Sequence, residues 1–176
     1  MNISMIEQID TKESTAKIRI IDQLHQYITN CGLNIVEENT KKPWGAYFKL
    51  DKNNITEFIN NYFEKEKGNI NTSLNLDPKF LLVAPHQRLS WQYHFRRSEI
   101  WTVLAGPVAV NLSKDNTEQK VKTKNTNDVI KIETQERHRL IGLDTWGIVA
   151  EIWVHTDNTN PSDESDIIRV QDDFGR

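Results

Sequence analysis

The 176-residue sequence has a single cysteine, Cys31, and no long apolar run. One thiol cannot form an internal disulfide, which is typical of proteins from a reducing compartment. No stretch approaches the roughly 20 apolar residues of a membrane-spanning helix. The first ten residues, MNISMIEQID, contain acidic residues and lack the apolar segment of a secretory signal. We therefore expect a cytoplasmic protein without a membrane segment.

A strong excess of positive over negative charge, or the reverse, is also absent. Charged residues make up 27% of the chain, and the formal net charge is -3. Basic and acidic residues are interspersed, with no basic stripe beside aromatic residues, which disfavours a nucleic-acid partner. The sequence also contains no glycine-rich phosphate loop and no constellation typical of nucleophilic catalysis.

Side chains that can bind a metal are present in the aromatic, β-prone stretch 88–107. Alternate residues of a strand face the same side, so Gln92 and His94 share one face, and a bend after them can bring Glu99 alongside. His138, far downstream, is the expected fourth partner. This mixture of nitrogen and oxygen atoms suits Zn, Mn, Fe, Co or Ni. An isolated histidine on a strand is more often a satisfied polar residue, so both interpretations stand.

Short apolar or alternating segments, separated by turns, follow one another from residue 80 onward. This pattern is typical of a β-sandwich or barrel. The expected strands cover residues 80–84, 88–95, 99–105, 108–112, 119–122, 129–132, 138–141 and 147–155. The apolar side chains of Ile167, Ile168, Val170 and Phe174 predict that the polar tail packs back onto the body.

The N-terminal part has a helical period. Residues 1 to about 12 are expected to be loose, and a helix should run from residue 14 or 15 to Cys31-Gly32 and cover an open face of the barrel. A short strand at 33–36 and an edge strand at 46–50 should follow. Thr56 is the expected cap of a second helix. The segment around this helix, residues 55–67, is an insertion that could act as a lid.

The order of motifs resembles that of the cupins. The first cupin motif reads His-x-His, three or four residues, Glu, six residues, Gly. Here Gln92 takes the place of the first His, and His94, Glu99 and Gly106 follow at that spacing. His138 corresponds to the histidine of the second cupin motif.

A closer resemblance is to the C-terminal cupin domain of type II mannose-6-phosphate isomerases, which is usually fused to a mannose-1-phosphate guanylyltransferase. It extends from Lys41 to the end of the chain. The matching segments are Lys42-Pro43-Trp44-Gly45, Arg88 to His94 with Arg97, Glu99 and Trp101, His138 to Leu140, Asp166 to Arg169, and Asp173 to Arg176. The resemblance implies a mainly β protein: a jelly-roll barrel, the cupin double-stranded β-helix, with an N-terminal helix and a short helical insertion. We expect residues 1–40 to form a helical extension and residues 41–176 to form the cupin domain.

The resemblance also implies a site. Gln92, His94, Glu99 and His138 would hold a divalent metal, with Zn the first expectation and Mn, Fe, Co or Ni as alternatives. Arg97 and Arg169 would be the cations for a phosphate or a transition state, with a surface salt bridge as the alternative for each. Independently of the resemblance, Glu151 is an unusual acid for its place in the apolar strand 148–154. We expect it to be a base or to orient a ligand histidine, with a structural hydrogen bond as the alternative. Arg88 and Arg139 are weaker candidates.

Departures from the family pattern affect the loops. The family often has three consecutive histidines where this chain has His94-Phe95-Arg96. His86 replaces a glycine before the first motif, and Glu133 and Gln135 replace a proline and a glycine before the second. These changes leave the ligand set whole and leave the loop shapes and the substrate open.

The resemblance implies a stand-alone, metal-dependent aldose–ketose isomerase. It would interconvert mannose 6-phosphate and fructose 6-phosphate, or act on a related sugar phosphate such as a heptose phosphate, through an enediolate. A non-catalytic sugar-binding cupin is the main alternative. A dioxygenase-like cupin is a third, against which Gln92 counts. The expected partners are a small sugar phosphate and a second copy of the chain in a homodimer. No segment resembles the guanylyltransferase domain, so we expect no synthesis of sugar nucleotides.

Overall fold

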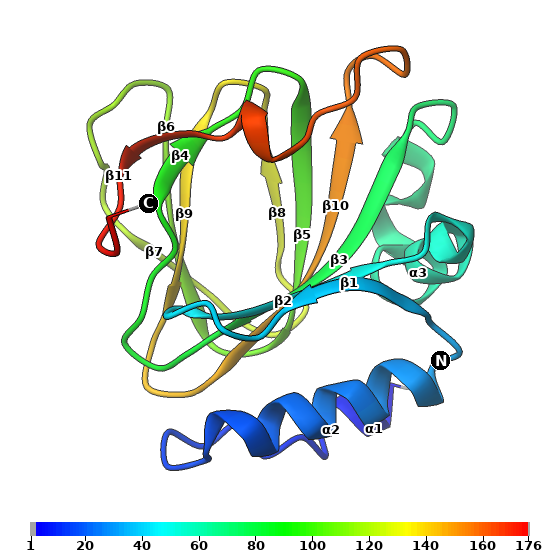
Figure 1. Ribbon diagram of the computed structural model, residues 1–176, viewed down its shortest axis with the longest axis vertical. Helices are drawn as coiled ribbons and strands as arrows, with labels where there is room; N and C mark the ends of the chain where they lie inside the picture. The colour runs from blue at the N-terminus through cyan, green and yellow to red at the C-terminus, as the bar shows by residue number, and fades with distance from the viewer. Residues whose placement is uncertain (1–2, 176) are drawn as a thin grey trace.

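Two antiparallel sheets form the body of the computed structural model, which describes residues 3–175 and the side chains from residue 5 onward (Figure 1). The first sheet has six strands in the order β1-β2-β3-β10-β5-β8, and the second has five in the order β11-β4-β9-β6-β7. The strands are β1 (Ile35–Asn39), β2 (Gly45–Leu50), β3 (Leu76–Val83), β4 (Trp91–Tyr93), β5 (Arg97–Ala105), β6 (Val108–Ser113), β7 (Lys122–Lys124), β8 (Val129–Ile132), β9 (Arg137–Gly142), β10 (Gly147–His155) and β11 (Ile168–Gln171).

Helices cover the outer face of the first sheet. They are α1 (Ile3–Ile6), α2 (Lys17–Asn30) and α3 (Ile55–Tyr62). The short 3-10 helices are η1 (Lys52–Asn54), η2 (Glu64–Asn69) and, in the C-terminal segment and away from that face, η3 (Glu164–Asp166). Figure 1 shows α2 lying along the underside of β1 and β2, and α3 beside β3. None of the helices described is long and apolar enough to cross a membrane.

Burial on both faces explains why β3 and β10 read as almost continuous apolar runs. In β3, Phe80 and Leu82 pack under the helices, whereas Leu81 and Val83 belong to the core between the two sheets. In β10, Ile148 likewise packs under the helices, whereas Val149 belongs to the core between the sheets. Alternation along each strand therefore places Lys79 and Glu151 on the inner face, directly opposite each other in register.

The mainly β barrel with an N-terminal helix and a short helical insertion is confirmed. The predicted strand at 129–132 and the one at 147–155 have the observed bounds, and α2 ends where Gly32 adopts a positive φ of 71°. The predicted boundary between residues 40 and 41 stays a prediction. It falls between β1 and β2, which pair in one sheet.

Several expectations about the N-terminal half were wrong. Residues 3–12 are not loose, because Ile6 and Ile9 are buried under the sheet with α2; residues 1 and 2 lie outside the described part. Strand β2 is not an edge strand, since β1 pairs with its outer side. Thr56 is not a helix cap, because the helix already begins at Ile55.

Further differences concern the ends of strands. β4 covers only 91–93 of the predicted 88–95, and β7 begins where the predicted 119–122 strand ends. The tail does return to the body, but it does so through backbone pairing of β11 with β4, and Ile168 and Val170 remain exposed. Backbone hydrogen bonds rather than apolar burial therefore hold that strand.

A buried carboxylate anchors the start of β3. The Asp77 carboxylate lies 2.7 Å from Lys52 Nζ and 3.2 Å from His155 Nε2. Burial by itself would raise the pKa of Asp77, but the hydrogen bonds from His155 and Lys52 outweigh it and hold the pKa below its usual range. The ionised carboxylate thus stabilises the folded chain at neutral pH.

We expect Asp77→Asn to lower the free energy of unfolding by about 2 kcal/mol at neutral pH, because the buried carboxylate loses its charge-assisted hydrogen bonds while the half-exposed Lys52 returns to water. The depressed pKa means that the wild-type advantage is present above the unfolded-state pKa of about 3.9 and fades as pH falls below it. Urea titrations at several pH values check this, with the exposed Asp144→Asn as control. A difference that stays constant down to strongly acidic pH would contradict the assignment.

Candidate metal centre and its cavity

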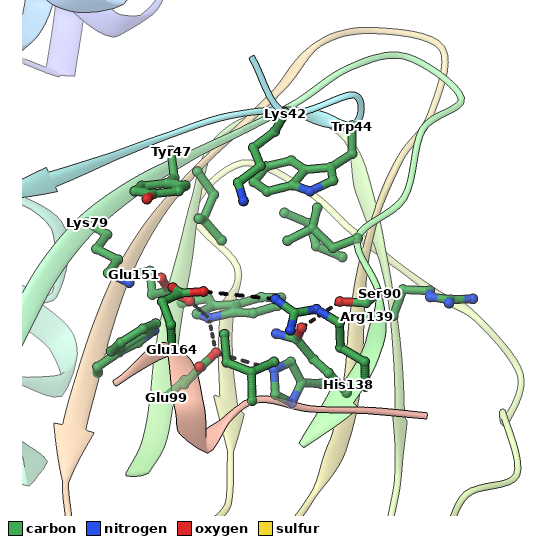
Figure 2. Close-up of a pocket in the computed structure, with 18 of the residues that line it drawn as sticks. Lys42, Trp44, Tyr47, Lys79, Ser90, Glu99, His138, Arg139, Glu151 and Glu164 are labelled. Atoms are coloured by element: carbon green, nitrogen blue, oxygen red, sulfur yellow. Dashed lines mark hydrogen bonds and ion pairs between the residues drawn. The ribbon is translucent and has the colours of Figure 1, made fainter. Parts of the chain in front are cut away.

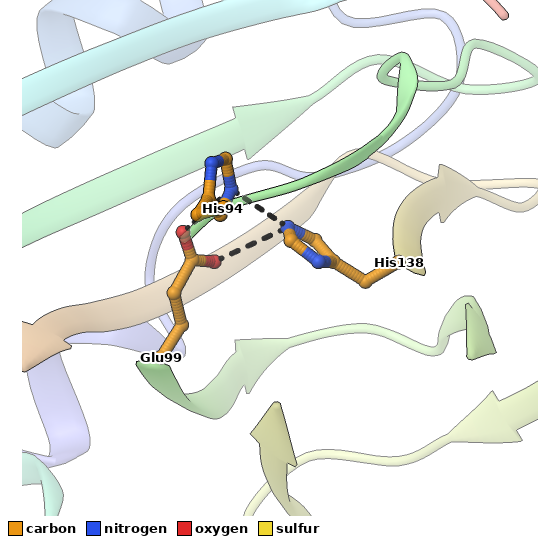
Figure 3. Close-up of side chains that lie close together, drawn as sticks. All are labelled: His94, Glu99 and His138. Atoms are coloured by element: carbon orange, nitrogen blue, oxygen red, sulfur yellow. Dashed lines mark hydrogen bonds and ion pairs between the residues drawn. The ribbon is translucent and has the colours of Figure 1, made fainter. Parts of the chain in front are cut away.

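Two histidines and a glutamate converge between the sheets (Figure 3). His94 follows β4, Glu99 lies on β5 of the opposite sheet, and His138 lies on β9. The Nε2 atoms of His94 and His138 are 3.3 Å apart. The Glu99 carboxylate lies 3.2 Å from His94 Nε2 and 3.5 Å from His138 Nε2. One ligand atom from each residue lies within 4.8 Å of the others, and all three side chains are buried.

Backbone carbonyls fix the tautomers of both histidines. His94 Nδ1 faces the Asp166 carbonyl at 3.4 Å, and His138 Nδ1 faces the Glu136 carbonyl at 3.0 Å. A carbonyl only accepts, so Nδ1 carries the hydrogen in each neutral ring, and the Nε2 lone pairs point toward each other and toward Glu99. Three electron-pair donors that meet in a buried space fit a bound cation, and carbonyl-oriented imidazoles are usual around protein metals.

The charge states also fit a metal centre. Burial lowers the pKa of His138 to about 4, so its imidazole is neutral at physiological pH. Burial would raise the pKa of Glu99, but the neighbouring His138, Arg97 and His94 hold it well below its usual range. Because His138 is neutral, Arg97 is the permanent cation in this set. The centre therefore presents a neutral His138 imidazole and an ionised Glu99 carboxylate, the protonation states that metal ligands require.

Arg97 is part of the buried network and not of the surface. Its Nε lies 2.9 Å from Glu99 Oε1, its Nη1 2.6 Å from Ser162 Oγ and its Nη2 3.0 Å from His94 Nε2. The guanidinium also stacks over the Trp153 ring at 3.4 Å. The surface salt bridge considered from the sequence is therefore wrong, and all three nitrogens of the guanidinium contact protein groups.

The C-terminal segment locks the turn between two of the ligands. The Asp166 carboxylate accepts hydrogen bonds from the backbone N–H groups of Phe95 and Arg96 at 3.1 and 2.9 Å, and from Ser162 Oγ at 2.6 Å. The Ser162 N–H in turn donates to His155 Nδ1 at 2.8 Å. His155, the last residue of β10, is fully buried and supports this segment through that bond.

Gln92 lies beside the three converging side chains. It pairs in register with His138 across β4 and β9, and it lines the same cavity. Its Oε1 accepts a hydrogen bond from Ser90 Oγ at 2.6 Å. An amide oxygen has two lone pairs, so this bond leaves one free for a ligand role, which stays a prediction.

A cavity opens from this centre (Figure 2), and the space between the atoms that line it, open solvent included, is about 620 Å³. Its wall is made by both sheets together with the C-terminal segment. The aromatic side chains in the wall are Trp44, Tyr47, Trp101 and Trp153, and the charged ones away from the metal ligands and Arg97 are Lys42, Lys79, Arg139, Glu151, Glu164 and Arg169. Its mixture of aromatic and charged groups suits a small polar ligand.

Glu151 lies next to the metal ligands, on the inner face of β10. The Trp101 indole N–H bridges the two acids, lying 3.1 Å from Glu99 Oε2 and 3.0 Å from Glu151 Oε1. Burial, together with the charge of Glu99, raises the pKa of Glu151 to about 8. The acid predicted from its unusual place in an apolar strand is thus both in the cavity and strongly perturbed, which is frequent at functional sites.

The predicted arginines fall in different places. Arg169 lines the cavity, its Nε is buried without a hydrogen-bond partner among the described residues, and its charged neighbour is the exposed Glu164 at 3.9 Å. Arg139 also lines the cavity and is held by Glu118 and Gln171. Arg88 forms a surface pair with Asp173 at 2.6 Å and does not line the cavity. Arg169 is therefore the arginine best placed to meet a ligand.

Lys79 was missed by the sequence analysis. It lines the cavity opposite Glu151, from an otherwise apolar strand. The signal that identified Glu151, a charged residue within a run that is buried on both faces, applies equally to Lys79. Lys42 and Glu164 were also missed as cavity residues, although Lys42 begins the motif Lys42-Pro43-Trp44-Gly45.

Comparisons with known proteins agree with this geometry. Residues 62–172 match the profile of the family described as mannose-6-phosphate isomerase C-terminal. A curated relative, a mannose-1-phosphate guanylyltransferase of Salmonella montevideo, is 24% identical over 167 residues, which cover 95% of this chain and 28% of the relative. The chain thus spans less than a third of that relative's length.

Solved structures with a similar fold include two cupins. The capsular polysaccharide assembling protein CapF of Staphylococcus aureus gives a TM-score of 0.51 at 16% identity, covering 76% of this chain and 33% of that one. A variant of the oxalate decarboxylase of Bacillus subtilis gives 0.54 at 11% identity, covering 76% and 30%. At such identities these likenesses concern the fold alone. The fold is that of a cupin, and the profile match over most of the chain shows that the protein belongs to the mannose-6-phosphate isomerase C-terminal family.

Proposed function

We propose that this protein is a metal-dependent aldose–ketose isomerase of sugar phosphates, acting on mannose 6-phosphate and fructose 6-phosphate or on a related substrate such as a heptose phosphate. The observation that carries the proposal is the convergence of His94, Glu99 and His138 in a cavity that also holds Glu151. The family match supports the same chemistry. A catalytic site needs both a place for charge to develop and a group that moves a proton, and the cavity offers both.

The proposed cofactor is a divalent metal, with Zn first and Mn, Fe, Co or Ni as alternatives. His94, Glu99 and His138 would hold it, and Gln92 would be the fourth ligand. The mixed nitrogen and oxygen donors suit borderline divalent ions. When bound, such an ion polarises the oxygens of the sugar and offsets the negative charge that develops as a proton leaves carbon.

The chain's own residues supply the remaining parts. Glu151 is the proposed base for the proton on carbon, since Trp101 fixes one of its oxygens and the cavity shields it from bulk water. Arg169 is the proposed phosphate cation, because its buried Nε has no partner among the described residues. Arg97 orients Glu99 and His94. A homodimer and a cytoplasmic location remain predictions.

The direct test is a coupled assay on the protein loaded with each candidate metal. We expect interconversion of mannose 6-phosphate and fructose 6-phosphate, abolished by a chelator and restored by one of the metals. Calorimetric binding of the sugar phosphate without turnover, on mannose and heptose substrates alike, would favour the non-catalytic sugar-binding cupin.

His138→Ala should lower metal affinity by at least about 100-fold, because it removes one ligand and leaves the Glu99 carboxylate poorly compensated. Metal content after dialysis against a weak chelator measures this. The matched control is His86→Ala, since His86 is exposed and pairs with Glu13 outside the cavity. Equal metal content in both variants would remove His138 from the ligand set.

Glu151→Gln should lower kcat by roughly 10²–10⁴-fold, the usual contribution of a positioned acid–base group, with little change in KM or in metal content. The amide keeps the size of the side chain and can still accept from Trp101. The exposed Glu7→Gln serves as control. Full activity of the Glu151 variant would mean that another group is the base.

A further inference from the structure

Lys79 is a buried lysine whose side chain enters the cavity. Only 6% of the residue is exposed, and alternation along β3 places it on the inner face with Leu81. It stands opposite Glu151 in the ladder between β3 and β10. Figure 2 shows its amino group reaching toward the Glu151 carboxyl on the cavity wall. Lysine is rarely buried in this way unless it is paired.

No such pairing holds the amino group. Among the residues that the structure describes, none forms a hydrogen bond or an ion pair with Lys79 Nζ within the usual limits. Its contacts are with aromatic faces: the nitrogen lies 3.0 Å from the centroid of the Trp153 ring and 5.7 Å from that of Tyr47. A desolvated amine with free donor capacity, facing a cavity, is costly unless a ligand uses it.

The charges around this amine come from three elements. Glu151 faces it from β10, Arg97 and Glu99 from β5, and Glu164 from η3. Burial lowers the pKa of Lys79 to about 8, and Arg97 acts in the same direction, whereas the three carboxylates oppose it. At slightly alkaline pH the amine therefore exists in both protonation states. Desolvation and a neighbouring cation are the two means by which enzymes activate lysine.

We propose that Lys79 is a second catalytic group of this cavity, an amine that contacts the bound sugar and exchanges a proton with its oxygen atoms. This inference rests on the proposed isomerase function. It assigns to Lys79 a role that the metal ligands and Glu151 leave open, the transfer of a proton between the two oxygens.

The proton balance of the reaction requires such a group. Converting an aldose into a ketose moves one proton from C2 to C1 and another from O2 to O1. In the first half, the Glu151 carboxylate takes the C2 proton while the Lys79 ammonium gives a proton to O1, which forms the enediol. In the second half, Glu151 returns its proton to C1 while the neutral Lys79 amine takes the O2 proton. Both side chains end in their starting states, and no outside oxidant or reductant is needed.

A structural lysine that merely stacks on Trp153 is the competing interpretation, and substitutions separate the two. Lys79→Arg keeps the positive charge, but a guanidinium does not release its proton. We therefore expect kcat to fall by about 100-fold or more in both Lys79→Arg and Lys79→Met, with metal content unchanged. Lys131→Met is the control, because Lys131 is half exposed and pairs with Glu66 outside the cavity. A Lys79→Arg variant that retains most of the wild-type kcat would overturn the proton-transfer role.

A second measurement does not depend on turnover. The metal-loaded wild-type protein is treated with pyridoxal 5′-phosphate, an aldehyde that also carries a phosphate. Borohydride then reduces the imine, and mass spectrometry locates the label. We expect Lys79 to be labelled faster than Lys131, with a rate that rises through about pH 8, and to be protected by mannose 6-phosphate or fructose 6-phosphate.

The two measurements distinguish the failure of either idea. Labelling of Lys79 that is no faster than that of Lys131, or that sugar phosphates do not slow, would overturn the assignment of Lys79 even if the wild type is an isomerase. Protected, rapid labelling in a protein without isomerase activity would instead remove the proposed function and keep Lys79 as an amine that contacts the ligand.

Discussion

The buried carboxylate of Glu99 holds the site together. It meets His94 and His138 from the opposite sheet and accepts from Arg97 and Trp101 on its own strand. A charge removed from water must be compensated locally, and every one of these contacts contributes to that compensation. The compensation links the two sheets at a single point. It also explains why an arginine and a tryptophan, both large and polar at one end, are buried in a small barrel.

The same constraint reaches the C-terminal segment. Arg97 also contacts Ser162, Ser162 donates to Asp166, and Asp166 caps the turn that carries His94. A segment that appears from its composition to be a solvated tail is therefore part of the support of the metal ligands. Supporting hydrogen bonds of this kind set the orientation of metal ligands and tune their basicity. Substitutions in this segment should therefore change the geometry of the metal ligands, although none of its side chains lies among the converging ligands.

The inner faces of β3 and β10 give the cavity its chemistry. Lys79 and Glu151 lie opposite each other between the two sheets, and both are buried there. Desolvation shifts the pKa of the acid upward and that of the amine downward, toward similar values. Relatives of this fold carry out unrelated chemistry, so the function has to be argued from these side chains and not from the barrel.

The sequence by itself determined the class of fold and most of the candidate site. Period-two segments with turns between them indicated the barrel, the motif spacing identified Gln92, His94, Glu99 and His138, and an acid in an apolar strand identified Glu151. These signals are local, and so they can be read from neighbouring residues. Tertiary structure alone decided which charges face one another. The placement of Lys79 opposite Glu151, the burial of Arg97 and the support from Asp166 depend on residues far apart in the chain. Their energies arise only when the sheets close and exclude water.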